Sequence, residues 1–288
     1  MNHRRLVVLA AAVGLILLAA ALRELYTRWR RRPPRPLDTP RYAGVAASAE
    51  YSSALALGAL ASVRAGEVLD AVQCRRPRRA IKRELRRAAE PYRHSVLGEE
   101  DIATAVGRCV NDLLGPAAET VGGHLARAEE LIRHRGRGGP DLWHHAIDEW
   151  AARAALPPEA VAGLHDTADQ IANAESDLRD AGILGAGEVV PSLLAFHWGP
   201  GVHLARGAIR AGWLDRTRGL NYLRRAGELA RLWYPTPRTL LAAQLLPAYL
   251  TADTATIRWA ELVVPPLLTD PRSPLTDPAP TPDQPAQA

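Results

Sequence analysis

The longest run of apolar residues along the chain lies near its N-terminus. Residues 6–22, LVVLAAAVGLILLAAAL, contain 17 positions without a charge. As an α-helix such a run spans about 25 Å, close to the roughly 30 Å hydrocarbon core of a bilayer. Tyr26 and Trp29 follow where aromatic side chains commonly meet the membrane surface. The pattern therefore predicts a single transmembrane helix, with its basic flank, in residues 1–30.

Arginines on the two sides of this run predict its orientation. Two arginines precede the run, whereas seven follow it before residue 42. Because Lys and Arg resist translocation, this excess predicts an external N-terminus and a chain whose bulk is cytoplasmic, in a single-pass protein of the cell inner (plasma) membrane. The alternative is a signal peptide cleaved near residues 19–21. The arginines that follow at once, and the lack of a polar region before such a site, argue against cleavage.

Proline-rich segments flank the central part of the chain. Residues 31–46 are rich in Pro and Arg and predict an extended tether. Residues 265–288 contain eight prolines and few bulky apolar residues, so they predict a disordered tail. The arginines nearest the predicted membrane helix are expected to contact anionic lipid, and they are Arg28, Arg30, Arg31 and Arg32.

Between these segments, residues 47–264 show a helical pattern throughout. Apolar residues recur at spacings of three and four, and no alternating β-branched run is long enough for a convincing strand. The fold class predicted is therefore an all-α, multi-helix globular domain behind the single N-terminal transmembrane helix. Clusters of Gly and Pro divide the domain into about eight to ten helices.

The stretch FHWGPGVHLARGAIRAGWLD, residues 196–215, illustrates these divisions. The Gly-Pro-Gly at residues 199–201 predicts a break between two helices, with His197 and His203 on its two sides. After the break, His203, Arg206 and Arg210 share the face opposite a broad apolar face. Farther along, Gly212 is expected to end this helix, Asp215 to cap the next, and Thr236 followed by Pro237 to cap a third.

These segments resemble the C-terminal half of a bacterial family, the domain of unknown function 1266. The likeness is carried by LAR at residues 204–206, AGWLD at 211–215 and YPT at 234–236. SSALALGALASVRAGEVLDAVQ, from Ser52, is similar to the opening helix of the family, so the likeness covers residues 48–250. The resemblance implies an all-α fold and no established activity. Family members usually have Asp and Arg where this chain has His197 and Pro200, which implies that an ion pair is absent there.

The net charge of +5 is unevenly distributed. Residues 1–45 hold nine Arg and two acids, which is +7, whereas the remaining residues hold 27 basic and 29 acidic groups, which is −2. Since the basic character belongs to the N-terminus, nucleic-acid binding is not expected. Within the rest, residues 75–87 are strongly basic and residues 141–190 strongly acidic, and these opposite patches could pair with each other.

The basic stretch RRAIKRELRRAA predicts an amphipathic helix. Its narrow apolar face lies beside a basic face that is made of Arg79, Lys82, Arg83 and Arg86. This pattern is typical of a helix that lies on anionic lipid. The alternative is a solvated face whose charges pair with acids of the same domain.

The stretch DLWHHAIDEW contains the candidate metal ligands. His144 with Asp148, and His145 with Glu149, are pairs four residues apart on one predicted helix. His165 and Asp169 repeat this spacing, and two such helices facing each other could supply the ligands of a metal ion. The alternative is a set of ordinary solvated pairs, since no H-E-x-x-H pattern accompanies them.

The residue composition excludes most other kinds of binding or catalytic site. Lys82 is the only lysine, and no glycine loop precedes it, which excludes a phosphate-binding loop. Cys74 and Cys109 lack C-x-x-C spacing and are expected to be reduced core cysteines. No catalytic residue and no cofactor are predicted. The sequence favours a membrane-anchored cytoplasmic binding or scaffolding module with lipid and an unidentified protein as partners; a membrane-tethered, metal-dependent enzyme is the alternative.

Overall fold

The computed structural model describes residues 39–44, 49–95, 98–99, 101–135 and 140–276. All described residues belong to one compact unit, Pro36–Ala288. The predicted transmembrane helix and Arg28, Arg30, Arg31 and Arg32 therefore lie outside the described residues. Within the part that is described, no helix is both long enough and apolar enough to cross a bilayer.

The described residues form an all-α domain, as the sequence predicts. A two-stranded antiparallel hairpin, β1 (His94–Ser95) with β2 (Gly98–Glu99), and two short 3-10 turns, η1 (Glu90–Tyr92) and η2 (Gly123–Leu125), interrupt the helices. The α-helices are α2 (Ala49–Leu57), α3 (Ala59–Ala65), α4 (Arg78–Ala88), α5 (Ile102–Leu114), α6 (Ala126–Arg135), α7 (Pro140–Arg153), α8 (Pro158–Asp180), α9 (Leu194–Ala211), α10 (Arg216–Trp233), α11 (Pro237–Leu250) and α12 (Thr254–Thr269).

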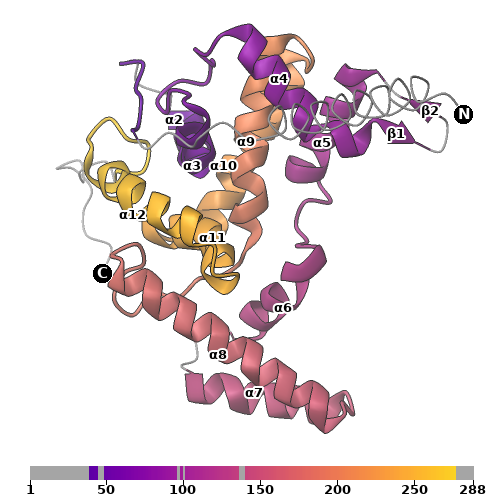
Figure 1. Cartoon of the computed structure of the whole chain (residues 1–288), viewed down its shortest axis with the longest axis vertical. Helices are drawn as coiled ribbons and strands as arrows, with labels where there is room; N and C mark the ends of the chain where they lie inside the picture. The colour runs from indigo at the N-terminus through magenta and orange to yellow at the C-terminus, as the bar shows by residue number, and fades with distance from the viewer. Residues whose placement is uncertain (1–38, 45–48, 96–97, 100, 136–139, 277–288) are drawn as a thin grey trace, which may run out of the picture. The chain divides into compact units, whose positions relative to one another are not determined.

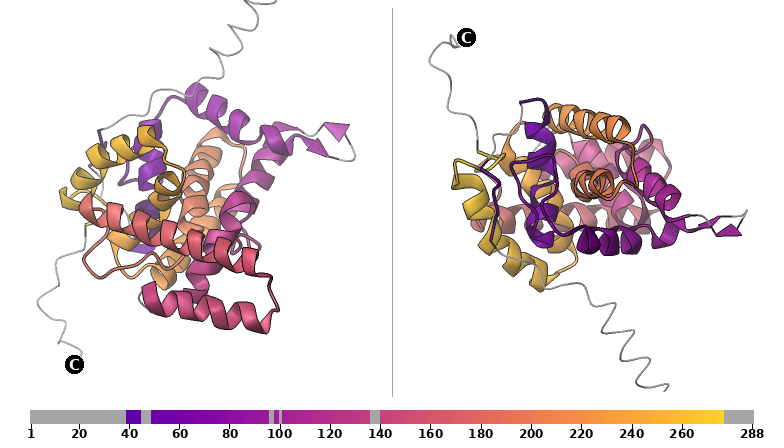
Figure 2. Two further views of the ribbon diagram at one scale, coloured as in Figure 1. Left: turned by 60° about the horizontal axis from the view of Figure 1, so that its bottom comes forward. Right: turned by 90° about the horizontal axis from the view of Figure 1, so that it is seen from above.

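Helix α9 is the centre of the domain. It lies among the other helices (Figure 1) and contacts α2, α3, α4, α5, α10 and α11. Most of its residues are buried. Helices α6, α7 and α8 pack on one another, and α8 also packs on α11. Figures 1 and 2 show α4 and the α7–α8 pair at opposite ends of the domain. The basic and acidic stretches of the sequence are therefore far apart, and they do not face each other.

The predicted break at residues 199–201 is wrong, because α9 runs through it without interruption. Pro200 removes one backbone N–H, and a proline inside a helix costs about 3 kcal/mol when nothing compensates. Here atoms of neighbouring helices lie very close to the two glycines. A Cβ on Gly199 would lie 2.7 Å from Gln244 Oε1 and 2.9 Å from the Leu57 carbonyl oxygen, and one on Gly201 would lie 2.8 Å from Leu114 Cδ2. The two glycines allow neighbouring helices to approach closely. The free energy gained from the surface buried in this way exceeds the cost of placing glycine inside a helix.

The predicted helix ends after this segment are confirmed. Gly212 ends α9 in the left-handed conformation, with φ of 74°. The Asp215 carboxylate caps α10 by accepting from the Arg218 N–H at 2.9 Å. Thr236 caps α11 in a reciprocal pair with Thr239, and Pro237 is the first helical residue. All of these contacts lie within four residues along the chain, which is why the sequence pattern suffices to predict them.

The domain is longer at both ends than the predicted residues 47–264. Arg41 pairs with Val68, and the Asp70 carboxylate accepts from the N–H groups of Ala43 and Gly44 at 2.5 and 2.8 Å. Part of the predicted tether, residues 31–46, is thus packed on the loop before α4. Similarly, α12 continues through residue 269, beyond the start of the predicted tail at residue 265, and Leu275 is buried after it.

Candidate functional site

A buried polar network joins α3, α4 and α9. The His203 Nε2 atom lies 3.0 Å from Glu84 Oε1, and the Ser62 hydroxyl oxygen lies 3.4 Å from His203 Nδ1. Because a carboxylate only accepts, Nε2 carries the proton that His203 donates to Glu84. The predicted polar face of α9 is therefore partly buried: His203 and Arg206 are buried, whereas Arg210 is exposed.

Arg206 is the most buried cation of this network, with 1 % of its surface exposed. Its guanidinium donates to the Ser62 hydroxyl at 2.9 Å and to the carbonyl oxygens of Val68 and Ala71 at 2.7 and 2.6 Å. Burial lowers the pKa of the Arg206 guanidinium, and the nearby acid Glu67 opposes this change. These bonds attach the loop between α3 and α4 to the central helix.

The same loop is held from inside by Glu67. This buried carboxylate accepts from the backbone N–H groups of Val68, Arg75 and Arg76 at 3.0, 2.7 and 3.3 Å. Cys74 lies beside it, and burial raises the pKa of the Cys74 thiol to about 12. A thiol with such a pKa is protonated near neutral pH and is a poor nucleophile.

Both cysteines are free and buried, as predicted. Burial also raises the pKa of the Cys109 thiol, to about 11. Neither thiol has the lowered pKa that is typical of reactive cysteines.

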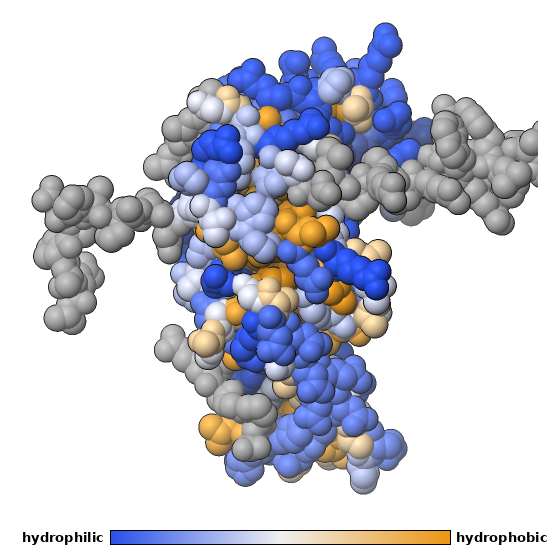
Figure 3. Space-filling view, turned by 60° about the vertical axis from the view of Figure 1, so that its left-hand side comes forward, coloured by the Kyte–Doolittle hydropathy of each residue, from blue (hydrophilic) through white to orange (hydrophobic). Residues whose placement is uncertain are grey.

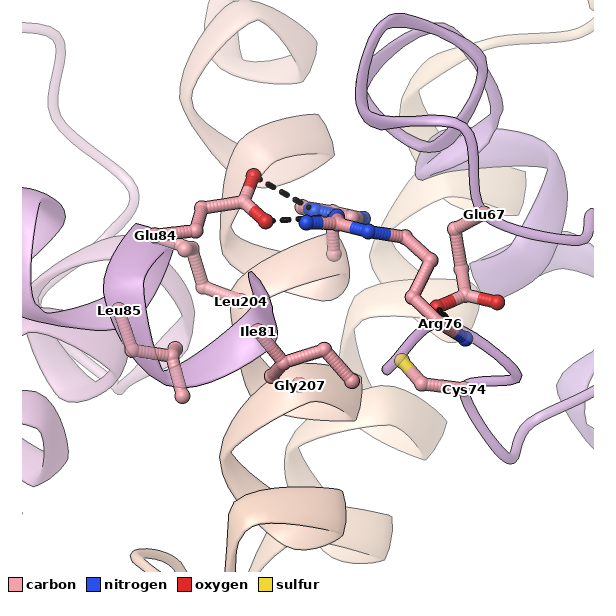
Figure 4. A pocket seen from close by; sticks show the side chains of 9 residues that line it. Glu67, Cys74, Arg76, Ile81, Glu84, Leu85, Leu204 and Gly207 are labelled. Carbon is pink, nitrogen blue, oxygen red and sulfur yellow. Dashed lines mark hydrogen bonds and ion pairs between the residues drawn. The ribbon is translucent and has the colours of Figure 1, made fainter. Parts of the chain in front are cut away.

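Glu84 joins the network to the first residues before α4. Figure 4 shows Glu84 and Arg76 pointing toward each other, and the Arg76 Nη1 atom donates to Glu84 Oε2 at 2.7 Å. Burial alone would raise the pKa of Glu84, but the hydrogen bond from His203 and the charge of Arg76 together lower it to about 2. Glu84 is thus an ionised carboxylate held by two donors from different segments.

The order hydroxyl, imidazole, carboxylate is that of a hydrolytic triad, but this network cannot admit a substrate. Ser62 is 0 % exposed and its oxygen already accepts from Arg206. The space that Glu84, Arg76 and their neighbours line in Figure 4, with His203 also on its wall, is too narrow for a water molecule. The network therefore joins three helices and does not form a reactive centre. Glu84 is the only acid in a basic stretch of the sequence, and this feature could have indicated the buried network.

The structure brings together only some of the candidate metal ligands. Helices α7 and α8 face each other, as predicted, but the His–Asp pairs form between the two helices and not within each one. His144 Nε2 lies 2.8 Å from Asp169 Oδ1, and His165 Nε2 lies 2.9 Å from Asp148 Oδ1. The rings of His144 and His165 stack with centroids 4.6 Å apart. His145 and Glu149 form a separate exposed pair at 3.3 Å. Throughout the described ranges, no group of three or more such side chains is arranged to hold a metal ion.

The basic residues of α4 lie on the outside of the domain. Arg79, Arg83 and Arg86 are exposed and Lys82 is half-buried, and none of them forms an ion pair with a described carboxylate. The one acid of the helix, Glu84, faces inward to His203 and Arg76. Figure 3 shows hydrophilic side chains gathered at the upper end of the domain, where Figure 1 draws α4. Internal pairing, the alternative from the sequence, is therefore not observed among these residues.

The sequence matches no protein-family model, and neither curated proteins nor solved structures give a significant match. The resemblance to the domain of unknown function 1266 stays a prediction.

Proposed function

We propose that the protein is a membrane-anchored cytoplasmic binding or scaffolding module whose helix α4 docks on the anionic surface of the membrane. The observation that carries this proposal is the basic face of α4, formed by Arg79, Lys82, Arg83 and Arg86, which has no ion pair among the described residues. We define these four residues as the docking face. A reporter enzyme fused after Ala288 tests the cytoplasmic topology, because alkaline phosphatase activity there would contradict it.

The strength of such docking follows from the charges. Each basic group close to an anionic leaflet contributes about 1 kcal/mol, so four contribute about 4 kcal/mol. The attraction fades within a Debye length of about 8 Å at physiological salt, which requires the face to lie directly against the lipid. Because no acid of the described residues forms an ion pair with the docking face, this energy is available for an external anion.

The end of the predicted tether is attached to the loop before α4. Residues 41–44 bind to Val68 and Asp70, in the loop that leads directly into α4. Residues 23–38, between the predicted membrane helix and the domain, reach at most about 55 Å when fully extended. A tether of this length keeps the domain at a high local concentration near the surface, so even a weak second contact is well populated.

Vesicle co-sedimentation of residues 36–288 tests the docking. This fragment is the compact unit that contains every described core residue. We expect it to pellet with anionic vesicles at low salt and to be released at high salt. Replacing the docking face by glutamine should weaken binding by about a thousandfold, since about 4 kcal/mol is lost.

The matched control removes four exposed arginines from other surfaces: Arg127, Arg153, Arg231 and Arg258. These replacements cause the same loss of net charge and should leave most of the binding intact. Equal binding to neutral and anionic vesicles, or equal loss in the two variants, would contradict docking through α4.

A further inference from the structure

The turn between α9 and α10 lies directly beside the docking face. Trp213 in this turn is half-buried and follows Gly212, which ends α9. The Lys82 Nζ and Arg86 Cζ atoms lie 5.2 and 5.4 Å from the centroid of the Trp213 ring. Arg78, at the start of α4, donates to the Ala211 carbonyl oxygen at 2.8 Å. Helix α4 and the turn therefore form one continuous surface.

Trp213 differs from the tryptophans of the core in its hydrogen bonding. The indole N–H of Trp143 donates to the Leu131 carbonyl oxygen at 3.0 Å, and that of Trp198 donates to the Ala118 carbonyl oxygen at 2.8 Å. The backbone N–H of Trp213 donates to the Ala208 carbonyl oxygen, but its indole N–H donates to no acceptor among the residues that the structure describes. A half-exposed indole with a free donor has the chemistry of a side chain at a membrane interface, where the ring meets acyl chains and the N–H meets polar head groups.

The two cations over the ring fit the same environment. Lys82 and Arg86 are like charges that contact one aromatic ring, and no carboxylate of the described residues forms an ion pair with them. Lipid phosphates would bring negative charge to both cations while the ring beneath them enters the boundary between head groups and acyl chains. A nucleic acid would also offer phosphates, but the excess of basic residues lies in the first 45 residues, around the predicted membrane helix, which favours a bilayer as the source of the phosphates.

We propose that Trp213 is the aromatic anchor of the docking face and inserts into the anionic bilayer beside Lys82 and Arg86. This inference rests on the proposed membrane docking and adds a second component to it. The cations of α4 provide the salt-sensitive part of binding, because ions screen their attraction. The indole provides a part that persists at high salt, because burial of apolar surface is not screened.

Fluorescence quenching by lipids with brominated acyl chains tests the insertion. Residues 36–288 are mixed with anionic vesicles, with and without bromine, and the wild type is compared with Trp213→Phe. We expect bromine to quench the wild type and the quenched component to disappear in Trp213→Phe. The matched control is Trp233→Phe, since Trp233 is also half-buried beneath an arginine, Arg133 at 5.5 Å, but lies at the far end of α10. This control should keep the quenched component.

Co-sedimentation at high salt gives an independent readout. Trp213→Ala should reduce the binding that remains at high salt by about tenfold, the loss expected when part of a large apolar side chain leaves the lipid. If this variant unfolds, Trp213→Phe in the quenching assay still shows whether Trp213 inserts into the bilayer. Salt-sensitive binding with the same quenching in wild type and Trp213→Phe would overturn the anchor and leave the docking of α4 intact. No binding of the wild type to anionic vesicles would overturn both.

Discussion

Buried charged side chains in this domain are each held by several partners. Glu67 and Arg206 are satisfied mainly by backbone groups of the loop before α4. Arg135 and Glu175 form a buried bidentate pair at 2.8 and 2.9 Å. Burying a charge costs several kcal/mol unless hydrogen bonds and an opposite charge compensate. At the scale of single residues, these groups specify one arrangement of the helices and are not free for chemistry.

Glu84 allows a test of this role through pH. The partners of Glu84 lower its pKa from the ordinary 4.5 to about 2, so its ionised form stabilises the fold above pH 4.5, and the stabilisation is lost as pH falls toward 2. We expect Glu84→Gln to lower the free energy of unfolding at neutral pH, and the difference from wild type to shrink across this acid range. Urea unfolding at several pH values measures it.

The control for this prediction is Glu90→Gln, at a carboxylate that is 64 % exposed and lies 3.8 Å from Arg93. An exposed ion pair contributes little, so this variant should show a small difference from wild type at every pH. A Glu84→Gln effect that is independent of pH would contradict the linkage.

At the scale of elements, the packing of α9 depends on its glycines. Helices α2 and α11 approach Gly199 so closely that a methyl group there would meet both Gln244 Oε1 and a backbone oxygen. Such overpacking costs typically 1–3 kcal/mol, which exceeds the gain of roughly 0.5–1 kcal/mol that alanine brings over glycine inside a helix. The residues that pack against α9, and not helix propensity, therefore determine that glycine is the more stable residue at position 199.

We expect Gly199→Ala to lower the free energy of unfolding by about 1–2 kcal/mol, because the steric cost exceeds the gain in helix propensity. Gly107→Ala is the matched control, since a Cβ on Gly107 in α5 would meet no atom within 4 Å, and it should raise stability by about 0.5–1 kcal/mol. Denaturant unfolding of the two variants compares them directly. Stabilisation by both alanines would show that close packing is not the reason for Gly199.

At the scale of the whole molecule, the limits of the domain can be tested by truncation. A chain that ends at residue 264 lacks Leu267 and Leu275, which are buried in the described core. Burying a leucine contributes about 1.5–3 kcal/mol, so this chain should be less stable by about 3–6 kcal/mol. A chain that ends at residue 276 keeps all described contacts and should melt as the full chain does. Equal melting temperatures for the two truncations would support the boundary predicted from the sequence.

The sequence by itself determines the all-α class and those helix ends that depend on near neighbours. Gly212, Asp215 and Thr236 act through bonds to residues no more than four positions away, so their patterns can be interpreted without knowledge of the fold. The same holds for the buried cysteines and for the basic face of α4, which follows from the helical period.

Only the tertiary structure decides which residues that are distant in sequence contact one another. The Gly-Pro-Gly predicted a break, but helices distant in sequence enclose it and keep α9 intact. His144 pairs with Asp169 across two helices, whereas its spacing had suggested Asp148. Glu84 and His203, 119 positions apart, meet in the interior, whereas the basic face of α4 forms no ion pair among the described residues. Packing sets these pairings because the free energy of burial and of satisfied polar groups is larger than the few tenths of a kcal/mol that separate local preferences.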